Sequence, residues 1–393
     1  MKMSKFETVR AFLGAAAAAV PLAFLPVATY STVISDTLTA DETKLTASDG
    51  APFDQFGISV SVSGNTAVIG AFADDDNGAT SGSAYVFENL GGVWVEVAKL
   101  TASDAAAGDR FGQSVSVSGN TAVVGADLDD DNGTDSGSAY VFANVGGAWY
   151  EVAKITASDG APGDHFSFQS VSVSGTTAVV GTSGGSSAYV FENFGGVWVE
   201  VAKLTASDGA PVSRFGLSVS LSGNTVVVGD PFGTDVNPSS AYVFEKMDQV
   251  WLETAKLTAS DGAPFDRFGI SVSLSGDTAV VGAIFASVNS SGSAYVFELR
   301  DLTPAEQTVN LIAGIEDLVA EGFLSSGAGT SLIKQLENAL KSLVKGNDNA
   351  VIKQLAAFAN VVQALIDGGL LTEEEGLPLI DAALSTIDQI LAG

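Results

Sequence analysis

Five blocks of alternating apolar and polar residues follow one another between residues 44 and 300, and all share one layout. Each begins with Lys-Leu-Thr-Ala-Ser-Asp or a close variant. An alternating strand, a Ser-Gly turn, a second strand ending in glycine and a Ser-Ala-Tyr-Val-Phe strand follow. Repeats of this length are supersecondary units that bury a core only by stacking. The opening lysines lie 49 to 55 residues apart, at Lys44, Lys99, Lys154, Lys203 and Lys256.

The second block shows how many strands a unit contains. The pattern predicts strands at 113–117, 121–125, 139–142 and 148–156, separated by Gly, Asn and Ser turns. Four short antiparallel strands are typical of one blade of a β-propeller. Four blocks carry a tryptophan in the fourth strand, namely Trp94, Trp149, Trp198 and Trp251.

The fifth block lacks a fourth strand after Phe297, whereas a spare strand precedes the first block at Glu42 to Ala47. Pairing the two would remove an open sheet edge. We therefore predict, over residues 31–300, a five-bladed β-propeller of four-stranded blades closed by the N-terminal strand. The alternative is an open arc or stack of blades.

Glycine motifs in the blocks resemble those of the FG-GAP repeat family, which forms the blades of integrin α-chain propellers and of many exported bacterial proteins. The resemblance covers residues 44 to 300. The third block departs from it, with Phe166-Ser167 and a shortened loop after Gly181. The first half of the signature is matched by Phe56-Gly57, Phe111-Gly112, Phe215-Gly216 and Phe268-Gly269, and the second half by Gly70-Ala71, Gly125-Ala126 and Gly282-Ala283, without the family's proline.

Beyond Arg300 the apolar period changes from that of strands to that of helices. Thr303-Pro304-Ala305-Glu306 forms a capping box, and apolar residues then recur at helical spacing. Residues 301–393 are predicted to form four helices in a small antiparallel bundle. Gly346-Asn347 followed by residues 354–358 resembles a helical module called FIMAH, which implies an accessory or interaction role. The alternative is a plain terminal bundle.

The N-terminus has the layout of a secretory signal. Lys2, Lys5 and Arg10 precede an apolar stretch at 11–28. We predict a signal peptide at residues 1–30 and an extracellular or cell-surface protein, with the periplasm as another destination. The alternative is an uncleaved anchor. We expect no other stretch to be apolar enough to span a bilayer.

Composition excludes several functions. The chain has 17 basic and 46 acidic residues, a formal charge of −29, which opposes binding to nucleic acid. Cysteine is absent, so disulfides and thiol catalysis are excluded. The one histidine, His165, stands where other blocks have Gln or Arg, which indicates a surface turn residue and leaves a catalytic triad without its base.

The loop of the second block is the best candidate for chemistry. Carboxylates at positions 1, 3, 5 and 9, with a backbone carbonyl at position 7, form an oxygen cage suited to calcium. The integrin-type calcium loop resembles this pattern, although its glycine usually stands one position earlier. The alternative is a solvated acidic turn. The predicted ligands are Asp127, Asp129, Asp131, Gly133 and Asp135.

Two further sets of residues recur in the blocks. Asp74 and Asp76 align with Asp129 and Asp131 and predict a weaker second calcium site. An aspartate also recurs at one point of every block, where it caps a turn or contributes to a cation-attracting rim. These aspartates are Asp49, Asp104, Asp159, Asp208 and Asp261.

These features predict a secreted or cell-surface binding or adhesion propeller, stabilised by one or two calcium ions, whose partner is an extracellular protein or glycan. Enzymatic activity is left open as the less favoured interpretation. The alternatives are a propeller hydrolase or lyase acting on extracellular polysaccharide through paired carboxylates, and a structural envelope protein.

Overall fold

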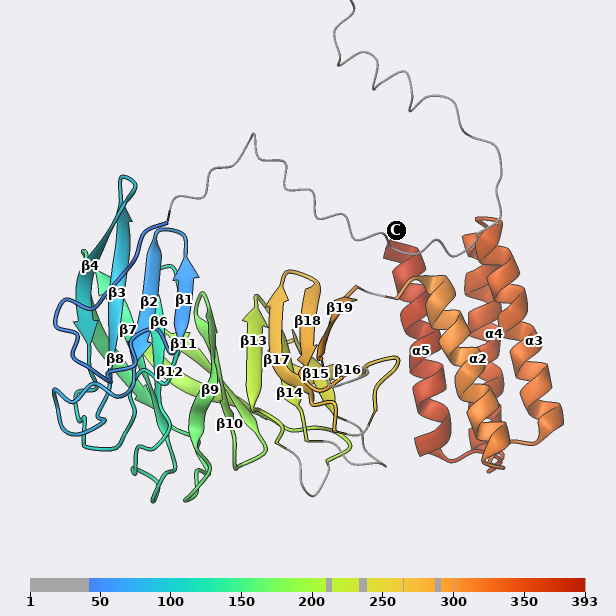
Figure 1. Cartoon of the computed structure of the whole chain (residues 1–393). Coiled ribbons are helices and arrows are strands. Elements are labelled where there is room, and N and C mark those ends of the chain that lie inside the picture. Colours follow the sequence, from blue (N-terminus) through green and yellow to red (C-terminus); the bar gives the residue numbers. More distant parts are fainter. Residues whose placement is uncertain are drawn as a thin grey trace, which may run out of the picture. The chain divides into compact units, whose positions relative to one another are not determined.

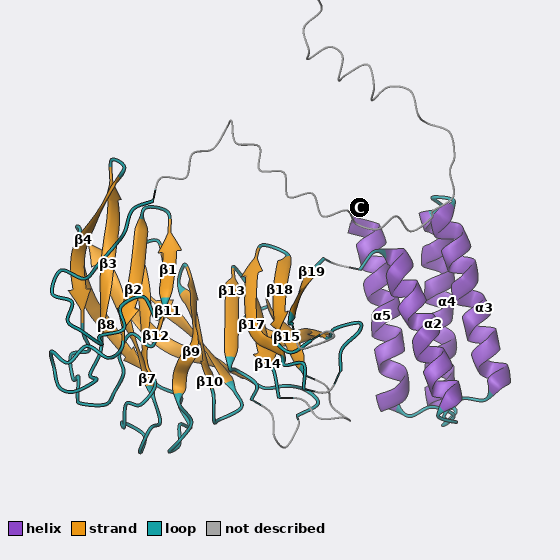
Figure 2. Ribbon diagram, in the orientation of Figure 1, coloured by secondary structure: helices purple, strands orange, loops and turns teal. Residues whose placement is uncertain are grey.

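The structure is a computed structural model that describes residues 42–209, 214–232, 239–263, 265–286, 291–300 and 302–392. The predicted signal peptide lies outside the described residues. Within them the chain forms β-sheets up to Glu298 and helices from Pro304 onward (Figures 1 and 2). The predicted combination of a mainly β repeat region and a helical bundle is confirmed.

The described residues contain five antiparallel sheets, one for each block, and each sheet keeps sequence order from its first to its last strand. We call these sheets the first to fifth blades. The first blade contains β1 (Val60–Ser63), β2 (Thr66–Ala71), β3 (Ser83–Leu90) and β4 (Val93–Leu100). The second contains β5 (Ser114–Ser118), β6 (Thr121–Ala126), β7 (Ser138–Val145) and β8 (Ala148–Ile155).

The remaining three blades follow in the same way. The third contains β9 (Phe166–Ser174), β10 (Thr177–Thr182), β11 (Ala188–Phe194) and β12 (Val197–Leu204). The fourth contains β13 (Ser218–Ser222), β14 (Thr225–Asp230), β15 (Ser240–Met247) and β16 (Val250–Leu257). The fifth contains three strands, β17 (Phe268–Ser275), β18 (Thr278–Ala283) and β19 (Ser293–Glu298).

Consecutive blades share apolar cores. Val68 and Val86 of the first blade are fully buried against Val115 and Val117 of the second. Within the second blade the ring of Phe111 packs edge-on against Tyr140, with 5.4 Å between the ring centroids. Such ring pairs recur in every blade, so each repeated tyrosine contributes to the packing of its own blade.

The signature glycines lie where the blades touch. A Cβ atom added to Gly70 would lie 2.0 Å from the carbonyl oxygen of Gly112 in the next blade. Gly112 itself has a φ of +90°, and a Cβ atom added there would lie 2.3 Å from the carbonyl oxygen of Ser83. Any larger side chain at either position would push the two sheets apart, so the glycines are required by packing.

Closure by the N-terminal strand is not confirmed. Residues 42–47 carry no strand and are mostly exposed, and the fifth blade has three strands in the described chain. No fourth strand is added at the edge of β19 among the described residues, and apolar side chains of the first and fifth blades stay exposed. Val296 on β19 is 64% exposed, although the equivalent Val86 and Val243 are buried.

Four helices form the bundle in the described C-terminal part: α2 (Pro304–Ala320), α3 (Ser326–Val344), α4 (Asp348–Asp367) and α5 (Glu373–Ala392). Thr303 and Glu306 make the predicted capping box, and the side chain of Ser325 caps α3 by accepting from the backbone N–H of Ala328. Ile315, Leu336 and Phe358 are fully buried in a core that is separate from those of the blades. A domain boundary at residue 301 and the FIMAH resemblance stay predictions.

Helix α4 corrects one expectation. By length and mean hydropathy (1.3) it is apolar enough to cross a membrane, the one helix of the described chain that is. However, Val351, Leu355 and Phe358 on α4 are fully buried in the bundle. We therefore interpret α4 as the core helix of the bundle.

Candidate metal centre

The acidic loop of the second blade joins β6 to β7 and is folded by its own carboxylates. Asp129 accepts a hydrogen bond from the backbone N–H of Asp131 (3.2 Å), and Asp130 accepts one from that of Asp135 (2.8 Å). Gly133 and Asp135 have left-handed φ angles of +120° and +56°. These aspartate turns bend the loop back on itself and fix the direction of its side chains.

Three carboxylates converge at the base of this loop around a lysine. The Nζ atom of Lys154 on β8 lies 2.7 Å from Asp104, 3.0 Å from Asp129 and 2.6 Å from Asp131. The hydroxyl of Tyr140 donates to Asp104 (2.8 Å) and to Asp129 (3.0 Å). We call this arrangement the Lys–Asp–Tyr cluster of the second blade.

The cluster has the donor set of a cation site, with an ammonium group at its centre. Oxygens of Asp104, Asp129 and Asp131 lie within 4.8 Å of one another, close enough to hold a metal ion. Burial would lower the pKa of Lys154, but its hydrogen bonds to the three carboxylates raise that pKa above the usual value. A metal ion would have to displace this charged lysine.

The first blade repeats the cluster. Lys99 lies 2.7 Å from Asp49, 3.0 Å from Asp74 and 2.5 Å from Asp76. The second predicted calcium site therefore has the same internal cation as the first. Burial opposes ionisation of Asp74, but hydrogen bonds from the Asp76 amide, Lys99 and Tyr85 bring its pKa below the usual value.

The recurring aspartate accepts a hydrogen bond from a tyrosine in every blade and pairs with a described lysine in the first four. In the third blade Asp159 pairs with Lys203 (2.6 Å) and accepts from Tyr189 (2.7 Å). In the fourth, Lys256 and Tyr242 take these roles for Asp208. In the fifth, Tyr295 donates to Asp261 (2.8 Å), and no described lysine pairs with this carboxylate. The lysine and tyrosine partners of this aspartate were not predicted, although all three residue types recur together in the sequence.

Asp127 is different from its neighbours in the loop. It is 1% exposed, and neither carboxylate oxygen has a hydrogen-bond partner among the described residues. Burial raises its pKa to about 6, and the nearby charges of Arg110 and His165 offset only part of this effect. In the first blade the equivalent position holds Phe72, whose ring lies 5.6 Å from the Arg110 guanidinium carbon.

The five predicted calcium ligands thus have different surroundings in the structure. Asp129 and Asp131 face Lys154, Asp127 is buried without a partner, and the charge of half-buried Asp135 acts on Asp127 to raise its pKa further. Gly133 packs against the next blade, since a Cβ atom there would lie 2.6 Å from Pro162. Carboxylate oxygens are the ligands that a hard divalent cation such as calcium prefers. Asp127 and Asp135 lie outside the set of carboxylates that pair with Lys154, and the charges of Arg110 and His165 act on Asp127.

Comparison with protein families identifies the blades. The model of the FG-GAP repeat matches five times, at residues 39–87, 94–142, 149–191, 198–244 and 251–297, which together make up more than half of the chain. No curated protein matches the chain. The four later matches each begin in the last strand of one blade and end in the Tyr-Val-Phe strand of the following blade, so the matched unit includes the aspartate, the glycines and the tyrosine described above. The chain belongs to the FG-GAP repeat family.

Proposed function

We propose that this chain is an exported binding or adhesion module on a propeller scaffold, stabilised by calcium, with an extracellular protein or glycan as its ligand. The observation that carries the calcium part is the Asp127 carboxylate, which is buried with both oxygens unpartnered in a loop containing four more aspartates. A buried charge is unfavourable unless a partner neutralises it. A bound cation would remove this cost.

Calcium suits the loop better than the smaller magnesium ion. Calcium takes six to eight oxygen ligands in flexible geometry, whereas magnesium needs a tight octahedral shell. Asp127 and Asp135 would supply carboxylate oxygens, and the loop backbone would supply carbonyl oxygens. At neutral pH a carboxyl group with a pKa of about 6 is mostly ionised, so the apo loop is destabilised under the conditions in which calcium binds.

Binding is favoured over catalysis by how the acids are used. In blades one to four the recurring aspartate is held by a lysine and a tyrosine, so its role is to join strands. Catalytic carboxylates would need to face a substrate, whereas these are bound to neighbouring side chains and Asp127 is buried. Repeated surfaces on successive blades suit recognition of an extended ligand.

Isothermal titration calorimetry of the full chain with calcium tests the metal site. We expect binding at about 0.1 to 1 mM, as in extracellular calcium modules, and loss of the signal in Asp127→Asn. Asp74→Asn in the first blade is the matched control and should keep it. Absence of binding at millimolar calcium in the wild-type protein would show that the loop is an acidic turn.

Arrays of glycans and matrix proteins test the binding function. The chain should retain at least one class of ligand when calcium is present and lose it after chelation. Asp127→Asn should weaken the same signal without abolishing the folded β spectrum. Hydrolysis of an arrayed polysaccharide by the wild-type chain would instead support the enzymatic alternative.

A further inference from the structure

The first blade has an uncovered face that is buried in the later blades. Val60 and Val62 on β1 are 69% and 66% exposed, whereas the equivalent Val115 and Val117 on β5 are 8% and 6% exposed. In the second blade these valines pack against the preceding blade. The first blade has the same apolar face with no blade before it in the described chain.

The fifth blade has the opposite uncovered face. Val296 and Val280 are 64% and 38% exposed, whereas the equivalent Val243 and Val227 of the fourth blade are buried against the next sheet. Similarly, an added Cβ atom at Gly282 would meet only its own blade, at Ser271 Oγ. The equivalent Gly229 is approached by the Gly269 carbonyl oxygen of the next blade. The fifth blade therefore exposes the surface that contacts the next blade at the other junctions.

A hydrogen-bond ladder repeats at every junction between blades. A serine hydroxyl on the inner strand of one blade accepts from a backbone N–H on the inner strand of the next. The observed pairs are Ser61 with Val117 (3.0 Å), Ser116 with Val173 (3.0 Å), Ser172 with Leu221 (3.0 Å) and Ser220 with Leu274 (2.9 Å). The next serine would be Ser273 and the remaining N–H that of Val62, and neither has such a partner in the described chain.

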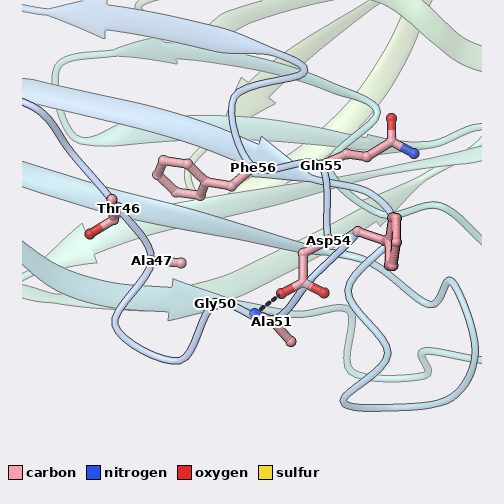
Figure 3. A pocket seen from close by; sticks show the side chains of 8 residues that line it. Thr46, Ala47, Gly50, Ala51, Asp54, Gln55 and Phe56 are labelled. Carbon is pink, nitrogen blue, oxygen red and sulfur yellow. Dashed lines mark hydrogen bonds between the residues drawn. The ribbon is translucent and has the colours of Figure 1, made fainter.

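A pocket marks the same place on the first blade. It has a volume of about 490 Å³ and is lined by residues between Thr46 and Phe56 (Figure 3). The Phe56 ring packs on Tyr85 but stays half-buried, while the equivalent Phe111 is fully buried. At the second blade the backbone N–H of Phe111 bonds to the Ser81 carbonyl of the first. The pocket thus lies where the preceding blade inserts its loop at the other junctions.

The sequence also supplies the missing part of the fifth blade. The family match at 39–87 has the same length as that at 94–142, which aligns Lys44 with Lys99. Lys99 faces Tyr85 across the strands and pairs with Asp49. By the same register Lys44 suits Tyr295 and Asp261, the cluster of the fifth blade that lacks a lysine.

From these matching surfaces we propose that the first blade of one chain packs on the fifth blade of a second copy, head to tail. The interface has the pattern that already joins consecutive blades four times within the chain. It pairs the face of a first blade with the different face of a fifth blade. Each added copy therefore leaves one first-blade face and one fifth-blade face exposed, and the assembly continues as an open or closed array. A second copy is the occupant because it carries the complementary face for each of the two faces that are exposed in the described chain, in the pattern that the internal junctions already use. Repulsion between chains of charge −29 should make the assembly stronger at higher salt.

The absence of cysteine allows a direct cross-linking test. Full-length Val62→Cys and Ser273→Cys variants are mixed and treated with a short bis-maleimide. We expect a covalent heterodimer that neither variant forms alone, and a ladder of larger species from the double variant. Ser61→Cys with Val117→Cys in one chain is the positive control, because these positions adjoin within the molecule. Cross-linking confined within single chains of the double variant would establish ring closure and overturn the proposal, as would no cross-linking.

A charge substitution gives an independent readout. Val60→Lys with Val62→Lys should abolish salt-dependent association in sedimentation equilibrium and leave the spectrum of the fold unchanged, because both side chains are exposed in the single chain. Val95→Lys with Val97→Lys, on the exposed face of β4, is the matched control and should associate as wild type. A wild-type chain that stays monomeric at high salt, or a Val60/Val62 variant that still associates, would contradict the proposal.

Discussion

The acidic loops of the first and second blades have one architecture but different electrostatics. In both blades three carboxylates pair with one lysine, and a tyrosine hydroxyl donates hydrogen bonds to two of these carboxylates. The second blade then adds Asp127, where the first has Phe72, and this carboxylate has no hydrogen-bond partner in the described part of the chain. The comparison separates two settings of acidic residues: those of the Lys–Asp–Tyr cluster hold strands together, and Asp127 is buried outside the cluster, where we propose that a cation binds.

Removing the central lysine should have the largest effect. Lys154→Met leaves three carboxylates facing one another, and losing one partner of such a partly buried network costs about 3 kcal/mol in the free energy of unfolding. Lys99→Met should cost the same in the first blade. Urea denaturation in the presence of a chelator measures both changes.

The control is Lys203→Met in the third blade, where the lysine is 39% exposed and pairs with one described carboxylate. An exposed pair contributes about 1 kcal/mol or less. Calcium should partly rescue Lys154→Met, because the emptied cluster presents three carboxylates to a cation. Equal losses in Lys154→Met and Lys203→Met would contradict the network.

Substituting the unpartnered carboxylate should have the opposite sign. Asp127→Asn should stabilise the calcium-free protein at pH 7.5 by about 1 to 2 kcal/mol, because an ionised carboxylate buried there is destabilising and a buried amide costs less. Thermal unfolding with chelator measures the gain. The reciprocal change Phe72→Asp should destabilise the first blade, and calcium should recover the loss. A destabilised Asp127→Asn variant would show that Asp127 has a partner in solution.

The pH dependence of unfolding should distinguish wild type from Asp127→Asn. Burial raises the folded-state pKa of Asp127 from 3.8 to about 6, so the folded state binds a proton more tightly than the unfolded chain. The contribution of Asp127 to stability is therefore fully present below about pH 4 and is lost as the pH rises through about 6. Urea unfolding between pH 4 and 8 should show the wild-type free energy of unfolding falling relative to the variant. Parallel curves would contradict the raised pKa.

Periodicity alone predicted the blades and the helices, because alternation and capping are local properties. The strand predicted at 139–142 lies within β7, and Thr303 caps α2 as expected. The loop aspartates were also identified. Their division between Lys154 and an isolated Asp127 depends on how β7 aligns with β8 and on side chains from neighbouring blades, which spacing within one loop does not encode.

Closure of the blades into a ring is a second feature that the sequence pattern does not determine. Residues 42–47 have the composition of a fourth strand, and the family match extends into them, yet they carry no strand in the structure. Whether five blades complete a circle depends on the rotation between adjacent sheets. Side-chain volumes at junctions such as Val86 against Val117 determine that rotation, and a hydrophobic pattern does not specify it.

The smallest predicted effect tests whether the two clusters are equivalent. Tyr140→Phe and Tyr85→Phe each remove a hydroxyl that donates to two carboxylates, and both acceptors keep their lysine. Because no acceptor is left unpaired, each change should cost about 1 kcal/mol, the usual net value of a hydrogen bond. Paired urea denaturation curves should agree to within about 0.5 kcal/mol, the additivity limit for independent sites. A clearly larger loss for Tyr140→Phe would mean that the unpartnered Asp127 carboxylate weakens the cluster beside it, so that the two loops differ in their architecture as well as in their charge.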